Sequence, residues 1–197
     1  QALFPPNPSL ISKNATTIVL NTHENLIAAY EEMLKLPTKY PIYAIQSNES
    51  MASVVLHYPL KQLEELNKGI KEKRLIVHAI LEEDVIARFG NLVEKQNHPT
   101  SELYQSVHGR SAVTRYVPQN TFSSSAEVWA WNGTVLIANW QKGTGVMIRD
   151  ENIYVFVIEL IRLFEEITRS VDQNPMLSKL AEINKEEKSV HNLHGNV

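Results

Sequence analysis

Apolar residues recur with two different periods along the first part of the chain. Short runs rich in β-branched residues predict three strands, over residues 16–20, 41–48 and 74–81. Between them, apolar residues spaced by three and four predict helices over residues 23–36 and about 51–73, the second of which bends or restarts at Pro59. The order β-α-β-α-β indicates a parallel or mixed sheet with helices packed on it.

The second half of the chain has a different pattern, in which short alternating runs follow one another. They predict four strands of an antiparallel meander, over residues 112–118, 126–131, 134–140 and 144–150. A long helix is predicted over residues 152–168, with Asp150 as its N-cap. Because this helix is apolar on most sides, we expect it to be deeply packed. Between the two halves, we expect a short helix over residues 84–94 and a long polar connection.

All three tryptophans lie in the stretch "AEVWAWNGTVLIANW", around Asn132-Gly133. Asn-Gly between two alternating runs is a strong hairpin signal, because a type I′ turn needs positive φ at both central residues. A two-residue loop places Trp129 opposite Leu136, with Trp131 on the same face of the ribbon. We expect this face to be either a second packed layer or a surface for a ligand or a partner.

Composition narrows the class of protein. The chain has 197 residues, a formal net charge of -3 and 43% hydrophobic residues, which fits a single globular domain with a sizeable core. No apolar run is long enough to span a bilayer, no signal peptide is visible and cysteine is absent, so we expect a cytoplasmic protein without a membrane partner. The slightly acidic balance argues against DNA binding by this segment itself.

The domain organisation follows from the same patterns. Residues 1–15 are rich in proline and are predicted to be a lead-in or linker. The folded domain is predicted over residues 16–171. Residues 172–197 are predicted to form a weaker amphipathic segment followed by a polar tail, whose last residues fray.

Known catalytic patterns are missing from the sequence. None of the seven histidines begins a His-x-Lys motif, and His108-Gly109-Arg110 is the nearest approach. We therefore expect no enzyme, no catalytic residue, no cofactor and no metal site. The run from Glu82 to Asp84 has two interpretations. It is either an acidic cluster exposed to solvent, which is the more common case, or a site that binds a cation. His78, inside an apolar strand, is more typical of a satisfied core histidine than of a ligand.

The order of several stretches resembles the effector-sensing domain of TrmB-like transcriptional regulators. These stretches are "TTIVLNTHENLIAAYEEML", "YPIYAIQSNESM", "ELNKGIKEKRLIVHAIL", "TRYVPQNTFSSSAEVWAWNGTVLIANW" and "TGVMIRDENIYVFVIELIRLFEEI". The resemblance implies a phospholipase D-like α/β fold without the catalytic His-x-Lys motif. It also implies a regulator that contacts DNA through a winged helix-turn-helix, which is expected to lie outside this chain.

The predicted sheet indicates which residues could contact a ligand. In α/β sheets, ligands bind beyond the carboxyl ends of strands, where this sequence places Ser47, Asn48 and Glu49 after one strand and Glu82 after another. Such polar groups, with Trp129 to stack on, suit a neutral polyol or sugar. Sugars are inducers for part of the resembled family, which implies a similar small-molecule effector.

The sequence is also compatible with other interpretations of the site and of the domain. Arg115 either binds an anionic ligand or is a surface charge whose aliphatic part is buried. The expected function is a non-catalytic ligand-sensing and dimerisation domain that works as a homodimer. The alternatives are a stand-alone protein-interaction or dimerisation module and, less favoured, a degenerate phosphodiesterase of the same fold.

Overall fold

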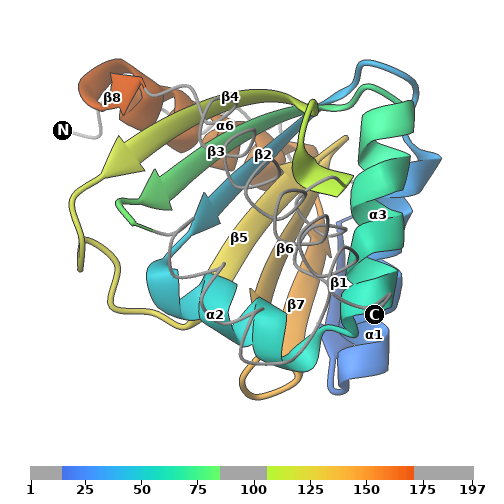
Figure 1. Ribbon diagram of the computed structural model, residues 1–197. Helices are drawn as coiled ribbons and strands as arrows, with labels where there is room; N and C mark the ends of the chain where they lie inside the picture. Colours follow the sequence, from blue (N-terminus) through green and yellow to red (C-terminus); the bar gives the residue numbers. More distant parts are fainter. Residues whose placement is uncertain (1–14, 85–105, 171–197) are drawn as a thin grey trace, which may run out of the picture.

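The computed structural model describes residues 15–84 and 106–170, which form one eight-stranded sheet flanked by helices (Figure 1). The α/β class predicted from the sequence is confirmed. The predicted lead-in over residues 1–15, the helix over 84–94, most of the polar connection and the segment over 172–197 fall almost wholly outside the described residues.

The first half contains β1 (Thr16–Leu20), α1 (His23–Glu31), the 3-10 helix η2 (Glu32–Lys35), β2 (Pro41–Gln46), α2 (Asn48–His57), α3 (Leu60–Glu72) and β3 (Ile76–Glu82). The second half contains β4 (Ser111–Val117), β5 (Ala126–Trp131), β6 (Thr134–Asn139), β7 (Thr144–Arg149), α6 (Glu151–Ile167) and the two-residue strand β8 (Arg169–Ser170). Every strand predicted from the sequence is present within a few residues of its predicted bounds.

The strand order is β1-β7-β6-β5-β2-β3-β4-β8, and it corrects one prediction. β4 was expected to open the meander, but it pairs in parallel with β3, so the meander contains only β5, β6 and β7. β1 lies at the far edge of the sheet, antiparallel to β7, so the sheet is mixed. Local patterns specify strands, whereas strand partners depend on contacts distant in sequence.

Helix boundaries follow from local chemistry. The predicted bend at Pro59 is a complete break, because proline separates α2 from α3 and lacks the N–H that a continuous helix requires. The side chain of Thr22 accepts a hydrogen bond from Asn25 N and caps α1. Ser47 caps α2 in a capping box with Ser50, so this helix begins earlier than its apolar pattern predicted.

The predicted hairpin is confirmed. Asn132 and Gly133 have φ values of 41° and 72°, as a two-residue turn with positive φ at both positions requires. Trp129 pairs with Leu136, and both belong to the larger apolar core. The tryptophan face of the ribbon is therefore a packed layer.

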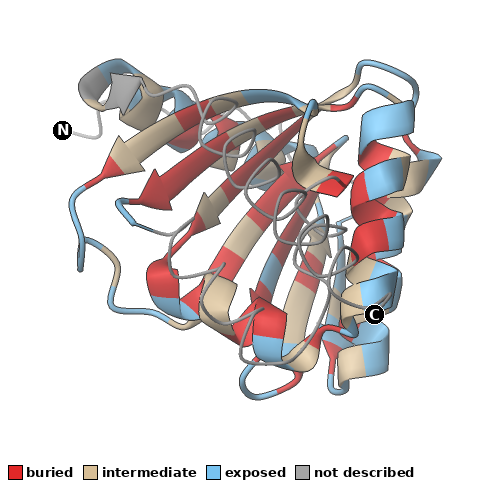
Figure 2. Cartoon of the chain, in the orientation of Figure 1, coloured by how far each residue is buried: buried red, intermediate tan, exposed pale blue. Residues whose placement is uncertain are grey.

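Two apolar clusters lie on opposite sides of the sheet. The larger includes residues of α1, α2 and α3 and occupies what we call the three-helix side. The smaller includes Ile158 and Ile161 of α6 and occupies the α6 side. Figure 2 shows buried residues along the strands and along the sheet-facing part of α3, and exposed residues on the outer part of that helix.

α6 does not match its prediction. Asp150 caps it as expected, with its side chain accepting from Asn152 N and Ile153 N. The helix is not deeply packed, however, because Phe156 is 59% exposed and Leu163 is 54% exposed. An apolar surface alone does not show what covers it, so the sequence pattern overstated the burial.

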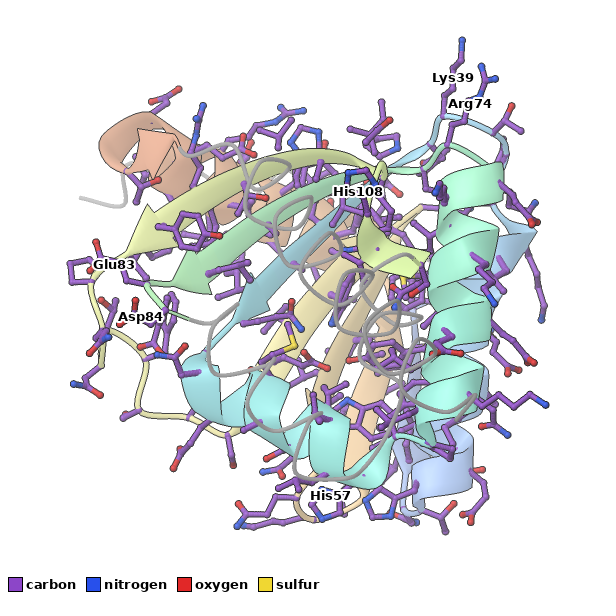
Figure 3. The ribbon with its side chains drawn as sticks, in the orientation of Figure 1. Lys39, His57, Arg74, Glu83, Asp84 and His108 are labelled. Atoms are coloured by element: carbon purple, nitrogen blue, oxygen red, sulfur yellow. The ribbon has the colours of Figure 1, made fainter. Side chains whose placement is uncertain are left out.

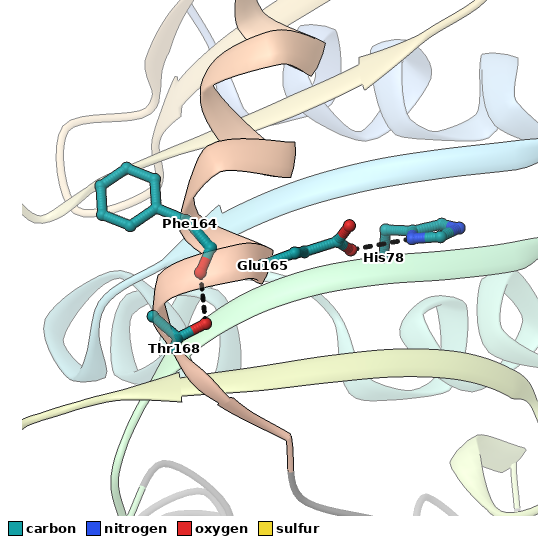
Figure 4. Close-up of polar contacts among 4 residues, drawn as sticks. All are labelled: His78, Phe164, Glu165 and Thr168. Atoms are coloured by element: carbon teal, nitrogen blue, oxygen red, sulfur yellow. Dashed lines mark hydrogen bonds and ion pairs between the residues drawn. The ribbon is translucent and has the colours of Figure 1, made fainter.

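Near its carboxyl end, α6 is tied to the sheet by a polar contact (Figure 4). His78 Nδ1 lies 2.9 Å from Glu165 Oε1, and the His78 ring stacks on Tyr43. The Thr168 hydroxyl donates to the carbonyl of Phe164 at the last turn of the helix. His78 is thus a satisfied, partly buried histidine, in agreement with the first of its two sequence interpretations.

Candidate functional site

A buried carboxylate occupies the beginning of β5. Glu127 is only 1% exposed and lies on the three-helix side, in the same alternation as Trp129 and Trp131. Its carboxylate accepts hydrogen bonds from the Tyr30 hydroxyl and the Gln46 side-chain amide, and from Trp140 Nε1 at 2.8 Å. We call Tyr30, Gln46, Glu127 and Trp140 the Glu127 cluster.

The electrostatics of this cluster follow from burial. Removal from water raises the pKa of the Glu127 carboxyl above its ordinary value, although hydrogen bonds from Tyr30, Gln46, Trp140 and Trp129 act in the opposite direction. Burial, together with the nearby Glu127 carboxylate, raises the pKa of the Tyr30 hydroxyl well above its ordinary value. Tyr30 therefore remains a hydrogen-bond donor at any physiological pH.

Aromatic rings enclose the carboxylate. Tyr30 meets Trp129 and Trp140 edge-on, with ring centroids 5.7 Å and 5.3 Å apart, which is a favourable geometry for aromatic pairs. Tyr58 lies 4.8 Å from Trp140 between ring centroids. One polar atom of this shell, Tyr58 Oη, is buried without a hydrogen-bond partner among the described residues.

A second polar group lies where β2 and β3 end, and we call Ser47, Asn48 and Glu82 the β2–β3 corner. Glu82 is buried, and its carboxylate accepts from Asn48 N at 2.7 Å and from Phe122 N at 2.9 Å. The Ser47 hydroxyl donates to the carbonyl of Ser124 at 2.6 Å. Asn48 Oδ1 is also buried without a hydrogen-bond partner among the described residues.

The two groups form one continuous edge. Gln46 of the Glu127 cluster precedes Ser47 of the β2–β3 corner, and the Ser47 contact at Ser124 lies three residues before Glu127. Because β2 and β5 are antiparallel, the carboxyl end of the first lies beside the amino end of the second. The hydrogen bonds thus connect β3, α2, β5, α1 and the end of β6 along one side of the molecule.

The sequence-predicted ligand residues are only partly brought together. Ser47, Asn48 and Glu82 meet in the corner, and Glu49 is exposed in the first turn of α2. Trp129 lies buried beside the Glu127 cluster rather than at an open edge. Arg115 pairs with Ile80, which belongs to the cluster on the α6 side, so the structure places it on the opposite side of the sheet from Trp129.

Sequence reasoning missed the centre of the site, namely Glu127 and its donors Tyr30, Gln46 and Trp140. One signal was available for Glu127, because a carboxylate alternating with two tryptophans must face the same side of a strand as they do. Its donors come from α1, β2 and the residue after β6, and no local pattern links those segments.

Glu83 and Asp84 of the acidic run lie far from His108, which begins the tripeptide most similar to the His-x-Lys motif (Figure 3). Glu83 and Asp84 follow β3 at its carboxyl end, whereas His108 precedes β4 and lies at the opposite end of these parallel strands. The Glu82 carboxylate is occupied by backbone N–H groups, and Asp84 accepts from the Gln119 amide. Among the described residues, no three His, Asp or Glu side chains are grouped as a metal site would require.

Comparisons with known proteins show a partial likeness of fold. No protein-family model matches this chain, and no curated protein matches it. The structure of TrmBL2, an archaeal chromatin protein described as showing a novel mode of DNA binding, is similar with a TM-score of 0.47 and 14% sequence identity. The likeness covers 83% of this chain and 57% of TrmBL2, so this chain spans little more than half of that protein.

A second solved structure is that of Nuc, a phospholipase D family member from Salmonella typhimurium. It is similar with a TM-score of 0.48 and 12% identity, over 80% of this chain and 99% of Nuc. A chromatin protein of the TrmB-like kind and a phospholipase D family member are thus what this chain is similar to. At such identities and TM-scores, neither a family nor a function follows. Within the described ranges, no helix combines the length and apolar character needed to cross a bilayer.

Proposed function

We propose that this domain is a non-catalytic sensor that binds a small neutral polyol or sugar. The binding site is the carboxyl edge of the sheet, between the Glu127 cluster and the β2–β3 corner. The observation that carries the proposal is a pair of buried polar atoms, Asn48 Oδ1 and Tyr58 Oη, that have no hydrogen-bond partner among the described residues. Because buried polar groups are ordinarily hydrogen-bonded, we take these two atoms to form hydrogen bonds with a ligand.

The chemistry of these atoms favours a ligand rich in hydroxyl groups. The Asn48 amide oxygen accepts and the Tyr58 hydroxyl both donates and accepts, which matches hydroxyl groups that themselves donate and accept. Faces of the surrounding tyrosine and tryptophan rings would pack against the apolar faces of such a ligand. Glu82 and Glu127, both carboxyl groups at this edge, would repel an anion.

The absence of catalysis is part of the proposal. Side-chain donors, among them Tyr30, Gln46 and Trp140, occupy the Glu127 carboxylate, and two backbone N–H groups occupy the Glu82 carboxylate. Neither carboxylate is therefore poised to take a proton from a substrate. The wider setting is a transcriptional regulator whose DNA-binding segment lies outside this chain. That setting rests on the sequence resemblance to TrmB-like regulators.

Ligand-induced stabilisation tests the proposal. We expect a neutral mono- or disaccharide to raise the melting temperature of the protein progressively with concentration, because a ligand of the native state adds RT ln(1 + [L]/Kd) to stability. The matching sugar phosphates should shift it less. Tyr58→Phe removes an unpaired hydroxyl, and Trp129→Phe removes an indole N–H beside the Glu127 carboxylate. We expect each to weaken binding about tenfold, and Tyr58→Phe to cost little stability without ligand.

Tyr40→Phe is the matched control. The Tyr40 hydroxyl donates to Asn132 Oδ1 at the hairpin turn, which lies at the other end of β5 from Glu127. This variant should bind the sugar as the wild type does. The proposal fails if no neutral sugar or polyol stabilises the protein, or if Tyr58→Phe, Trp129→Phe and Tyr40→Phe all respond alike.

A further inference from the structure

The amino ends of the parallel strands β2, β3 and β4 form a second edge of the sheet, opposite the proposed sugar site. Figure 3 shows His108 at this edge, and Glu83 and Asp84 at the other. Arg110 immediately precedes β4 and therefore lies at the same edge as His108. Because β4 has seven residues, the two edges are about 20 Å apart. A charged group bound near Arg110 would thus be remote from the carboxylates of the sugar site.

Arg110 has a positive charge that no described carboxylate neutralises. Its Nη1 donates a hydrogen bond to Asn67 Oδ1 of α3 at 2.7 Å. Nε is buried without a hydrogen-bond partner, and no described carboxylate forms an ion pair with this guanidinium. Buried arginines are ordinarily paired, because an uncompensated charge that is removed from water is costly. The guanidinium therefore lacks a counter-charge among the described residues.

The pKa of Arg110 is consistent with this missing counter-charge. Burial lowers the pKa of the Arg110 guanidinium to about 10, and no attraction to a carboxylate offsets that effect. The group is still protonated at neutral pH, so it keeps the charge that would attract an anion.

The unpaired part of the guanidinium has the geometry that binds an oxyanion. Asn67 uses one N–H of Nη1, which leaves Nε–H and an N–H of Nη2 on a different edge of the planar group. These two N–H groups are parallel, and they match two oxygens of a phosphate or a carboxylate. The Arg110 side chain is partly exposed although Nε is not, so an anion would approach from the solvent side.

A second cation lies beside this edge of Arg110. Asn67 and Lys71 are four residues apart on α3, so they face the same way. A Cβ on Gly109 would lie 3.8 Å from Lys71 Nζ, so the ammonium is next to the residue that precedes Arg110. Gly109 has a φ of 76°, which favours glycine, and any side chain there would contact Lys71. The fold thus brings two cations from separate segments together.

We propose that Arg110 and Lys71 form a binding site for a small oxyanion, in which the Nε and Nη2 edge of Arg110 holds two oxygens. A phosphate group is favoured over a carboxylate, because it has a further oxygen for the Lys71 ammonium. Asn67 is a positioning residue that fixes the guanidinium plane. The site is separate from the proposed sugar site and does not depend on it.

Thermal melting with inorganic phosphate or acetate, at an ionic strength held constant with sodium chloride, tests this site. We expect phosphate to raise the melting temperature of the wild type, and acetate to raise it less. Arg110→Lys keeps the charge but has no pair of parallel N–H groups, so it should bind phosphate at least about tenfold more weakly. Lys71→Gln should weaken binding about threefold. An acetate response as strong as the phosphate response would retain the site and identify its ligand as a carboxylate.

Lys61→Gln is the matched control for Lys71→Gln, since it removes the same charge from an exposed lysine ten residues earlier on α3. It should leave phosphate binding unchanged. Lys71 is exposed, so its variant keeps the test valid even if Arg110→Lys does not fold. A wild type that responds to neither anion overturns the proposal. So does a phosphate response that survives both Arg110→Lys and Lys71→Gln, or one that Lys61→Gln weakens as much as Lys71→Gln does.

The two proposed sites can be measured independently. A sugar phosphate could bind at either of them, so its comparison with the neutral sugar is made on Arg110→Lys. A neutral sugar should stabilise Arg110→Lys and the wild type equally, whereas Tyr58→Phe should leave phosphate binding unchanged. If Tyr58→Phe weakened phosphate binding as much as Arg110→Lys does, the anion would not be at Arg110.

Discussion

The two sides of the sheet differ in how completely their apolar residues are covered. The three-helix side combines five buried aromatic rings with a hydrogen-bonded carboxylate, and Trp140 among them is fully buried. The α6 side has one helix, a smaller cluster and five exposed apolar side chains on that helix. The difference teaches that buried polar groups are concentrated on the first side, where we propose ligand binding, and exposed apolar surface on the second.

Truncating one aromatic residue on each side gives the largest expected contrast. Trp140→Ala removes a buried indole that packs on Tyr30 and Tyr58, so we expect it to lower the free energy of unfolding by about 4 kcal/mol. Phe156→Ala on α6 removes a ring that is 59% exposed, and we expect a change within about 0.5 kcal/mol in the monomer. Urea denaturation at low protein concentration measures both values, and equal losses would contradict the comparison.

Removing the buried Glu127 carboxylate should give the second-largest contrast between the two sides. Glu127→Ala leaves the donors of Tyr30, Gln46 and Trp140 without their acceptor, which should cost about 3 kcal/mol of stability in urea denaturation. His78→Ala also breaks a contact to a glutamate, but on the α6 side and in a partly exposed place. We expect it to cost less than half as much, so the opposite ranking would refute the assignment of Glu127 to a buried network.

The Glu127→Gln variant tests the pKa of this carboxyl. Its pKa is raised in the folded state, so protonated Glu127 favours folding fully below the unfolded pKa of about 4.3. That contribution is lost as the pH rises through the folded pKa. The wild type should therefore lose stability relative to Glu127→Gln over this window, as measured by urea denaturation at several pH values. If the stability difference between the wild type and Glu127→Gln did not depend on pH, burial would not be raising the pKa of the Glu127 carboxyl.

Helix caps provide the smallest contrast. Ser47→Ala removes the α2 cap and the hydrogen bond to Ser124, so we expect it to cost about 2 kcal/mol of stability. Asp150→Ala removes only the exposed cap of α6 and should cost about 1 kcal/mol. Thermal melting monitored by circular dichroism compares them. If Asp150→Ala were the more damaging, α6 would be held more by its cap than by packing.

Local signals predicted much of the fold. Asn132-Gly133 fixed the hairpin and its register, and Pro59 marked the break between α2 and α3. Asp150 was recognised as a cap from its position before an apolar helix. Each of these signals acts through backbone conformation within a few residues, which is why single-sequence reasoning reaches it.

Long-range pairing was not predictable in the same way. The pattern of β4 is equally compatible with a meander strand, and only its partner β3 shows that it is parallel. The candidate site was found in part, since Ser47, Asn48 and Glu82 follow strands that are neighbours in the sheet. Glu127 and Tyr30 are almost a hundred residues apart in sequence, and nothing local joins them. The ligand role of the predicted residues stays a prediction.

The position of β1 has a consequence for the order of folding. This strand is among the first residues of the domain to be synthesised, yet its hydrogen-bonded partner β7 is among the last. The meander of β5, β6 and β7 closes through short turns, so it can form early, whereas β1 must close a loop that encloses most of the domain. On the ribosome, β1 therefore cannot pair with β7 until nearly the whole domain has emerged, and of the described elements only α6 and β8 follow β7 in the chain.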